Sequence, residues 1–269
     1  MRKRKLQSLN HKILLQILSY NVNGLRAAMR NGLMEWISAH SFDILCFQEV
    51  KATVDQVDLA PFEALGYRLV GWNAAKKKGY SGVAIFSKIP ADSYVLGCGT
   101  DLYDQEGRII CADFGNITIV NAYFPSGTSG DARQGIKMSF LSDFQAWIQT
   151  LQQAGRSLVV VGDYNIAHQE IDIHDPVRNK NTTGFLPEER AWMSQWFGSG
   201  FTDAFRHANP DLVEYSWWSY RAGARGNNKG WRIDYQSVSN SLCPHIKSCR
   251  HLADAVHSDH CPVYLELDF

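Results

Sequence analysis

Short apolar runs along this chain end repeatedly in polar clusters. The runs LLQILSY, FDILCF, ITIV and SLVVV have the length and composition of buried strands. The clusters are Asn21-Val22-Asn23-Gly24, Gln48-Glu49, Asn121-Ala122-Tyr123, Gly162-Asp163-Tyr164-Asn165, Arg232-Ile233-Asp234-Tyr235 and Ser258-Asp259-His260. Because an open α/β sheet builds its binding site at the ends of its strands, we expect these distant clusters to meet on folding.

Helical patterns alternate with the strand-like runs. Residues 25–40 carry apolar side chains at helical spacing and predict one amphipathic helix, and residues 131–153 predict a long one. Another helix is expected from Pro187, with acidic residues in its first turn. Further strands are expected at YRLVGWN, SGVAIFS, RIICADF and NITIVNAYF, consecutive and antiparallel, and at YSWWSY, WRIDYQSV and CPVYLEL. We therefore expect one mixed α/β domain over residues 12–269, after a basic, flexible leader at 1–11.

Composition narrows the class of protein. The 269 residues include 27 basic and 27 acidic side chains, so the chain lacks the overall basic excess typical of nucleic-acid binders, although a local patch suffices for binding. Six cysteines without a C-x-x-C pair indicate reduced thiols of a cytoplasmic protein and argue against zinc. No run reaches membrane-spanning length, and the N-terminus lacks a signal-peptide pattern.

The polar clusters carry the groups needed for hydrolysis. In an extended segment Asp163 and Asn165 would point the same way, so a carboxylate and an amide would share one cavity and activate a water. A simple turn is the competing interpretation of Gly-Asp-x-Asn. Taken alone, Glu49 is most typical of a solvated strand end. Together with the strand-end residues Asn21, Asn23 and Asp259 it is a candidate metal ligand, because carboxylate and amide oxygens suit magnesium.

His260 lies just before the last predicted strand. A single histidine there is usually structural, and a catalytic role requires a carboxylate that fixes its tautomer and favours its charged form. Asp234, which we place at the end of a short strand, is the candidate partner. A charged imidazole held in this way would bind the anionic oxygens of a phosphate. Tyr123 is a candidate hydrogen-bond donor to the same group, with plain packing as the alternative.

The ordered set of motifs resembles the exonuclease III family of abasic-site endonucleases, within the endonuclease/exonuclease/phosphatase superfamily. The matching stretches, from about Ile13 to Phe269, are ILSYNVNGLRA, ILCFQEVKA, KKGYSGVAIFSK, IVNAYFPSGT, VVVGDYNIAHQEID, GFLPEER, FTDAFRH, GWRIDYQSVS and HSDHCPVYLEL. The resemblance implies a four-layered, DNase I-like α/β sandwich with two packed mixed sheets flanked by helices.

The same resemblance implies residue roles. Glu49 would be the main Mg²⁺ ligand (Mn²⁺ substituting), with Asn21, Asn23 and Asp259 nearby in the metal site. The catalytic groups would be Asp163, Asn165, Tyr123, and His260 oriented by Asp234. Segments that meet DNA in relatives match Arg26, Lys51, Gly79 and Tyr80, and candidate wedges are Arg221 and Arg225. Positions that line a pocket for a flipped-out abasic sugar match Trp217, Trp231 and Ile233, for which core packing is the alternative.

One loop departs from the family pattern. Residues 126–131 read Ser-Gly-Thr-Ser-Gly-Asp where some relatives carry an asparagine that contacts the phosphate. This leaves open the balance between internal incision and trimming of 3′ ends.

The function that the resemblance implies is Mg²⁺-dependent incision of duplex DNA 5′ to abasic sites, leaving a 3′-hydroxyl, with 3′-end cleaning and 3′→5′ exonuclease activity. The partner would be double-stranded DNA with abasic sites or blocked 3′ ends, cut by a monomer in the cytoplasm, at the nucleoid in a bacterium. The alternatives are a predominant 3′→5′ exonuclease or 3′-phosphatase, a nonspecific nuclease or an enzyme of the superfamily acting on phospholipid or inositol phosphates, and a DNA-binding scaffold without catalysis.

Overall fold

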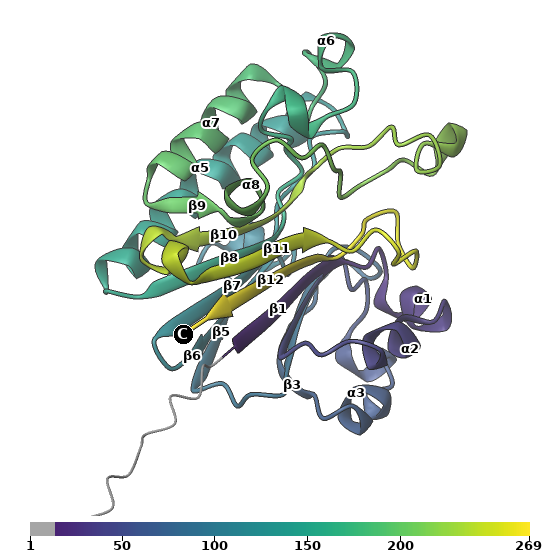
Figure 1. The fold of residues 1–269 in the computed structure, drawn as a ribbon, viewed down its shortest axis with the longest axis vertical. Helices are drawn as coiled ribbons and strands as arrows, with labels where there is room; N and C mark the ends of the chain where they lie inside the picture. Colours follow the sequence, from purple (N-terminus) through teal and green to yellow (C-terminus); the bar gives the residue numbers. More distant parts are fainter. Residues whose placement is uncertain (1–13) are drawn as a thin grey trace, which may run out of the picture.

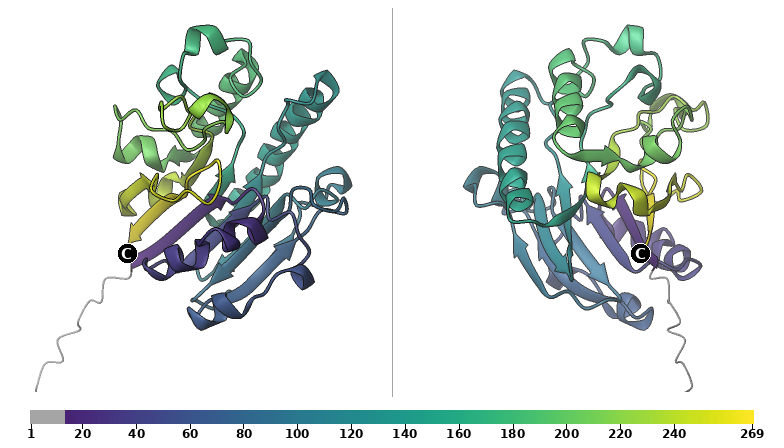
Figure 2. Two further views of the ribbon diagram at one scale, coloured as in Figure 1. Left: turned by 90° about the vertical axis from the view of Figure 1, so that its right-hand side faces the viewer. Right: turned by 60° about the vertical axis from the view of Figure 1, so that its left-hand side comes forward.

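Two six-stranded sheets pack face to face, and helices cover the outer face of each (Figure 1). The computed structural model describes residues 14–269, so the predicted leader at 1–11 lies outside the described residues. Helices α5 and α7 lie over one sheet, and α1, α2 and α3 lie over the other (Figures 1 and 2). The expected four-layered α/β sandwich is confirmed.

The two sheets share one plan, with a parallel pair of strands at the centre and antiparallel strands on both sides. In order across the first sheet, the strands are β11 (Ile246–His251), β12 (Val263–Asp268), β1 (Leu14–Asn21), β2 (Ile44–Gln48), β4 (Val83–Ser87) and β3 (Arg68–Asn73). Across the second sheet they are β5 (Ser93–Leu96), β6 (Ile109–Phe114), β7 (Ile117–Tyr123), β8 (Ser157–Asp163), β10 (Asp234–Ser239) and β9 (Phe201–Asp203).

The helices are short except for two. They are α1 (Leu25–Arg30), α2 (Leu33–Ser38), α3 (Ala60–Ala64), α4 (Asp101–Asp104), α5 (Asp131–Gln153), α6 (Pro176–Asn179), α7 (Pro187–Gly198) and α8 (Ala204–Ala208). Single 3₁₀ segments lie at η1 (Val54–Gln56), η2 (Glu170–Asp172), η3 (Arg221–Gly223) and η4 (Asn240–His245). The helices at 131–153 and from Pro187 are therefore where the sequence predicts them.

Aliphatic side chains from the central strands fill the space between the sheets. Every residue of β2 and β4 is buried, as expected for strands covered on both faces. The inter-sheet core includes Ile17, Ile44, Ile85, Ile119, Val159, Val161, Val238 and Leu265. In the central parallel pairs, Asn21 pairs with Gln48 and Tyr123 pairs with Asp163 in register. These residues end their strands, and both pairs end at the same edge of the sandwich.

Several local predictions are wrong for identifiable reasons. The single helix expected at 25–40 divides at Gly32, whose φ of 90° turns the chain between α1 and α2. The strands β4 and β6 belong to different sheets, so antiparallel pairing holds only within β3–β4 and β6–β7. Around Trp217, the YSWWSY segment forms only isolated bridges.

Asp234 begins β10 and does not end a strand as predicted. Because β10 runs antiparallel to β8, its first residue lies opposite Asp163, the last residue of β8. The start of one strand and the end of its neighbour therefore reach the same edge of the sheet.

A buried amide joins the two sheets across the core. Asn121 on β7 donates from Nδ2 to the carbonyls of Phe47 and Ala84, both at 3.0 Å, which belong to the opposite sheet. Its Oδ1 accepts a hydrogen bond of 2.7 Å from Gln48 Nε2. Since Asn121 is fully buried, removing its amide would leave these partners unpaired in an apolar environment.

We expect Asn121→Leu to lower the free energy of unfolding by about 2–4 kcal/mol, since two carbonyls and an amide lose their partner. Urea denaturation measures the change. Gln149→Leu, an amide replaced on the exposed side of α5, is the matched control and should change stability by less than about 0.5 kcal/mol. Equal losses in the two variants would contradict a cross-sheet role for Asn121.

Candidate active site

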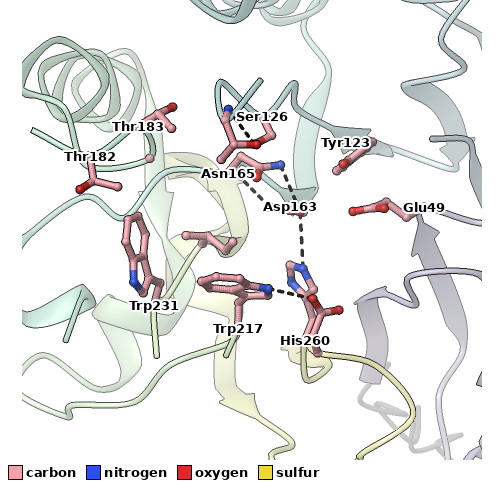
Figure 3. A pocket seen from close by; sticks show the side chains of 14 residues that line it. Glu49, Tyr123, Ser126, Asp163, Asn165, Thr182, Thr183, Trp217, Trp231 and His260 are labelled. Carbon is pink, nitrogen blue, oxygen red and sulfur yellow. Dashed lines mark hydrogen bonds and ion pairs between the residues drawn. The ribbon is translucent and has the colours of Figure 1, made fainter. Parts of the chain in front are cut away.

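The polar clusters converge on one open cavity of about 400 Å³ at the edge of the sandwich (Figure 3). Its lining residues come from segments more than two hundred positions apart: Glu49, Tyr123, Ser126, Thr128, Asp163, Asn165, Thr182, Thr183, Gly184, Trp217, Trp231, Ile233, Asp259 and His260. The central strands of both sheets end here, which brings the predicted catalytic groups together.

Left-handed backbone turns the chain at three of these strand ends. Asn23, Glu49 and Asn165 have φ values of 45°, 52° and 54°, which is uncommon for residues other than glycine and is typical of functional sites. Asp163 and Asn165 face one cavity, as predicted. Strand β8 ends at Asp163, so Asn165 lies in a left-handed turn beyond the strand.

Asn21 connects the two sheets through its side-chain amide. Its Nδ2 donates to Glu49 Oε1 and to Asp163 Oδ2, each at 2.9 Å. Asn21 ends β1 and Glu49 follows β2, both in the first sheet, and Asp163 ends β8 of the second. The Asn21 Oδ1 atom accepts a hydrogen bond from the main-chain N–H of Asn23 at 3.0 Å. Asn21 therefore orients two carboxylates and is placed to act through them.

Lys51 supports Glu49 from the other side. Lys51 Nζ lies 2.7 Å from Glu49 Oε2 and also donates to Asn23 Oδ1. Burial alone would raise the pKa of Glu49, but the Lys51 ammonium and the Asn21 hydrogen bond hold it below its ordinary value. Glu49 is thus a carboxylate that stays ionised.

Two buried side chains, Asp234 and Ser216, orient the His260 ring. Its Nδ1 lies 2.8 Å from Asp234 Oδ2, and the Ser216 hydroxyl donates to the same oxygen at 2.6 Å. Burial alone would lower the pKa of His260, but the Asp234 carboxylate raises it to about 10. The imidazole is therefore a cation held with Nε2 toward the cavity.

Asp163 lies at the centre of the cluster (Figure 3). It accepts from Asn165 N at 2.8 Å and from Asn165 Nδ2 at 3.2 Å, and Oδ2 lies 3.9 Å from His260 Nε2. Burial, together with the nearby Asp234 carboxylate, raises the pKa of Asp163. A carboxyl group of this kind is suited to taking up a proton near neutral pH.

Tyr123 faces the same cavity from the end of β7. Its ring stacks under the Arg108 guanidinium, 4.8 Å away, and its carbonyl accepts from Arg108 Nη1 at 2.8 Å. Burial and then the Glu49 carboxylate raise the pKa of Tyr123 well above its ordinary value. The phenol is therefore neutral and can donate a hydrogen bond.

The donor set fits a divalent cation. One carboxylate oxygen each from Glu49 and Asp163 and a nitrogen of His260 lie within 4.8 Å of one another. The charged imidazole is a poor ligand, so the oxygen donors here are carboxylates, of which Glu49 is the one that stays ionised. Four carboxyl groups (Glu49, Asp163, Asp234, Asp259) face two cations (Lys51, His260). The site keeps an excess of negative charge for a metal to offset whether Asp163 is ionised or protonated.

The other predicted metal residues surround this centre. Asp259 accepts from Asn23 Nδ2 at 2.9 Å and from Trp217 Nε1 at 3.0 Å. Both oxygens of Asp259 are thus engaged with neighbouring side chains, as is the Asn23 amide. Asn23 and Asp259 therefore lie beside Glu49 in one hydrogen-bonded group, and Asp259 lines the cavity together with Glu49.

Aromatic and aliphatic side chains form the opposite wall of the cavity. Trp217 and Trp231 lie with ring centroids 6.1 Å apart at 89°, and Ile233 is buried beside them. The three residues predicted to line a sugar pocket therefore share one cavity with Asp163 and His260. Sequence reasoning missed the loop at residues 182–184, which completes this wall.

The predicted DNA-contact residues lie in different settings. Arg26 and Arg221 are exposed, and Gly79 is exposed beside Tyr80, whose hydroxyl accepts from Arg108 Nη2 at 3.0 Å. Arg225 instead donates to the carbonyls of Ser258, Ala253 and Ala255 and stacks on Trp218. Its guanidinium holds the loop before His260, and its role as a DNA wedge stays a prediction.

The fold and the cavity define a class of enzyme, and comparison with known proteins agrees. Residues 18–260 match the model of the Endonuclease/Exonuclease/phosphatase family. The chain belongs to this family and is a nuclease, a phosphodiester hydrolase.

Named relatives narrow the comparison. The chain is 44% identical over 253 residues to the exodeoxyribonuclease of Bacillus subtilis, covering 93% of this chain and 98% of that protein. It is 38% identical over 258 residues to the DNA repair nuclease APEX1 of Danio rerio, covering 94% and 82%. The solved structure of the 3′ phosphatase NExo from Neisseria bound to a product DNA hairpin superimposes with a TM-score of 0.87 at 26% identity, covering 95% and 100%.

Within the described residues, no helix has the length and apolar character that crossing a membrane requires. The six cysteines are free, as predicted.

Ser216→Ala is expected to lower kcat/KM for phosphodiester hydrolysis about tenfold, because Asp234 loses a short hydrogen bond and holds His260 less firmly. A steady-state assay on a nuclease substrate measures this. Ser199→Ala removes a hydroxyl that bonds the Trp196 carbonyl, remote from the cavity, and should leave the rate unchanged. An unaltered rate in Ser216→Ala would show that the Ser216 hydroxyl is not needed to hold Asp234 and His260 in place.

Proposed function

We propose that this protein is a Mg²⁺-dependent DNA repair phosphodiesterase that incises duplex DNA 5′ to abasic sites and leaves a 3′-hydroxyl. We further propose that it cleans blocked 3′ ends and acts as a 3′→5′ exonuclease. The observation that carries the proposal is the single cavity in which Glu49 and Asp163, both bonded to Asn21, face His260 beside the Trp217 wall. The names of its relatives support a DNA substrate.

The side chains divide the chemistry of phosphodiester hydrolysis among them. Asp163 accepts the proton of the attacking water, and the Asn165 amide helps to hold that water in line. His260, as a cation, binds a non-bridging phosphoryl oxygen, and the Tyr123 hydroxyl donates to the same phosphate. A Mg²⁺ ion held by Glu49 would polarise the phosphoryl oxygen and stabilise the leaving oxygen.

The apolar wall gives this chemistry its selectivity. Trp217, Trp231 and Ile233 offer a dry surface of limited size beside the reacting phosphate. A deoxyribose without a base fits there, whereas an intact nucleotide must also place its base. Extrusion from the duplex is cheapest where stacking is already lost, which favours abasic sites.

Double-stranded DNA is the proposed partner of the surface around the cavity. Arg26, Gly79, Tyr80 and Arg221 lie on segments that would meet the sugar-phosphate backbone, and Lys51 combines this with its ion pair to Glu49. Such contacts position the duplex without reading its sequence. We propose that the enzyme works as a monomer in the cytoplasm.

A second candidate is a predominant 3′-phosphatase or 3′→5′ exonuclease. The chain is similar in structure to a protein named as a 3′ phosphatase, and Ser126 and Thr128 line the cavity where some relatives differ. Both candidates use the same catalytic groups and differ in which DNA end or sugar reaches them.

Asp163→Asn and His260→Asn are each expected to lower kcat by at least about two orders of magnitude, the usual scale for one acid–base group. Circular dichroism verifies that each variant is folded. The matched controls Asp101→Asn and His207→Asn change the same residue types at exposed positions and should keep wild-type rates. Near-wild-type turnover in either catalytic variant would remove that residue from the mechanism.

One gel assay ranks the proposed activities. Three duplexes carry an internal abasic site, a 3′-phosphate or an undamaged recessed end, each tested with EDTA and after addition of Mg²⁺ or Mn²⁺. We expect EDTA to abolish cleavage, either metal to restore it, and the abasic duplex to react fastest. Faster reaction of the 3′-phosphate duplex would favour the second candidate, and cleavage that survives EDTA would refute metal dependence.

A further inference from the structure

A buried ion pair lies behind the cavity and takes no part in the chemistry described above. Lys137 on α5 and Glu189 in the first turn of α7 are both 0% exposed, and their side chains meet at 2.5 Å from Nζ to Oε1. Burying two charges costs several kcal/mol per ion unless further hydrogen bonds satisfy them. The partners of this pair therefore indicate what it holds in place.

Glu189 anchors the loop that forms one wall of the cavity. Its Oε2 accepts the main-chain N–H of Gly184 at 2.6 Å and of Leu186 at 3.0 Å. Its Oε1 accepts from Gln134 Nε2 at 3.0 Å, and Thr183 Oγ1 donates to Gln134 Oε1 at 2.7 Å. Thr183 and Gly184 line the cavity, so one carboxylate fixes the backbone of this wall.

Lys137 extends the same network to the catalytic loop. Its Nζ donates to the main-chain carbonyl of Asn165 at 2.8 Å. Asn165 in turn donates through its backbone N–H and its side-chain amide to Asp163. The ion pair thus holds the backbone beside the catalytic carboxylate in fixed relation to the 182–184 wall.

Close contacts leave these segments little freedom. A Cβ on Gly184 would lie 2.9 Å from the Trp231 ring and 3.1 Å from the Asn165 carbonyl. A Cβ on Gly127 would lie 1.8 Å from Gln134 Oε1 and 2.3 Å from Thr183 Oγ1. Three segments that border the cavity, at 126–128, 165 and 182–184, therefore meet at the Gln134–Lys137–Glu189 network.

We propose that Glu189, with Lys137 and Gln134, sets the width of the cavity and thereby its discrimination between a baseless sugar and an intact nucleotide. These three are positioning residues, since none of them lines the cavity. The inference rests on the proposed function, because it concerns which substrates the same site accepts. Shifts of about 1 Å at a reacting centre are enough to change rates strongly.

Two substitutions test the proposal, one within the ion pair and one beside it. Glu189→Gln keeps the shape of the side chain, but its amide N–H₂ must face another donor, which loosens the 182–184 wall. Gln134→Leu, at a half-buried position, leaves the ion pair intact and removes the bonds to Glu189 and Thr183. If Glu189→Gln does not fold, Gln134→Leu carries the test.

The readout is the ratio of kcat/KM for incision at an abasic site to kcat/KM for removal of an undamaged recessed 3′ nucleotide. A looser wall admits the larger group, so we expect this ratio to fall about tenfold in Glu189→Gln and about threefold in Gln134→Leu. The matched control is Phe62→Leu, which weakens the core under α3 on the opposite sheet and should leave the ratio unchanged.

The outcomes separate this inference from the proposed function. A wild-type enzyme that cleaves neither duplex would overturn both. A wild-type enzyme with both activities, and variants in which the two rates fall equally as in Phe62→Leu, would overturn only the role of the network in selectivity. A lowered ratio in the network variants alone supports it.

Discussion

The arrangement of the site depends on the amide of Asn21. Each sheet ends in carboxylate-bearing segments that would repel one another if nothing lay between them, and the Asn21 Nδ2 atom donates to Glu49 and Asp163 at equal distances of 2.9 Å. A neutral donor in this position links the two sheets without adding charge. His260 and Lys51 offset part of the negative charge of the site, and a divalent cation would offset the remainder.

The two sheets have the same arrangement of strands, and this arrangement brings their central strand ends together at the Asn21 contact. Each sheet places a parallel pair at its centre, and the ends of the two pairs lie at one edge of the sandwich. The antiparallel neighbour β10 adds Asp234 opposite Asp163, so the orienting carboxylate of His260 comes from the start of a strand. The net charge of the whole chain is zero, and the function depends on this local imbalance instead.

Much of this arrangement can be predicted from the sequence. The polar residues that follow apolar runs, such as Glu49 and Asp163, mark the edge of the sheets because strand periodicity and burial are local properties. The break of the first helix at Gly32 and the left-handed turn at Asn165 depend on individual dihedral angles that composition does not specify. The sequence predicts Glu189 as an acidic residue in the first turn of a helix. Its burial against Lys137 depends on how α5 and α7 pack, which no local pattern encodes.

The central claim is that Asn21 acts as a hydrogen-bond donor to two carboxylates, and Asn21→Asp tests it most directly. The substitution keeps the shape of the side chain but replaces the donating N–H₂ with an oxygen that faces Glu49 and Asp163. The account predicts that the single-turnover rate on an abasic duplex at saturating Mg²⁺ falls at least about 100-fold, since the loss of two charge-assisted bonds costs about 3 kcal/mol or more. A rate close to wild type, with equal or tighter Mg²⁺ binding, would show that Asn21 serves as a metal-ligating oxygen and would contradict the account.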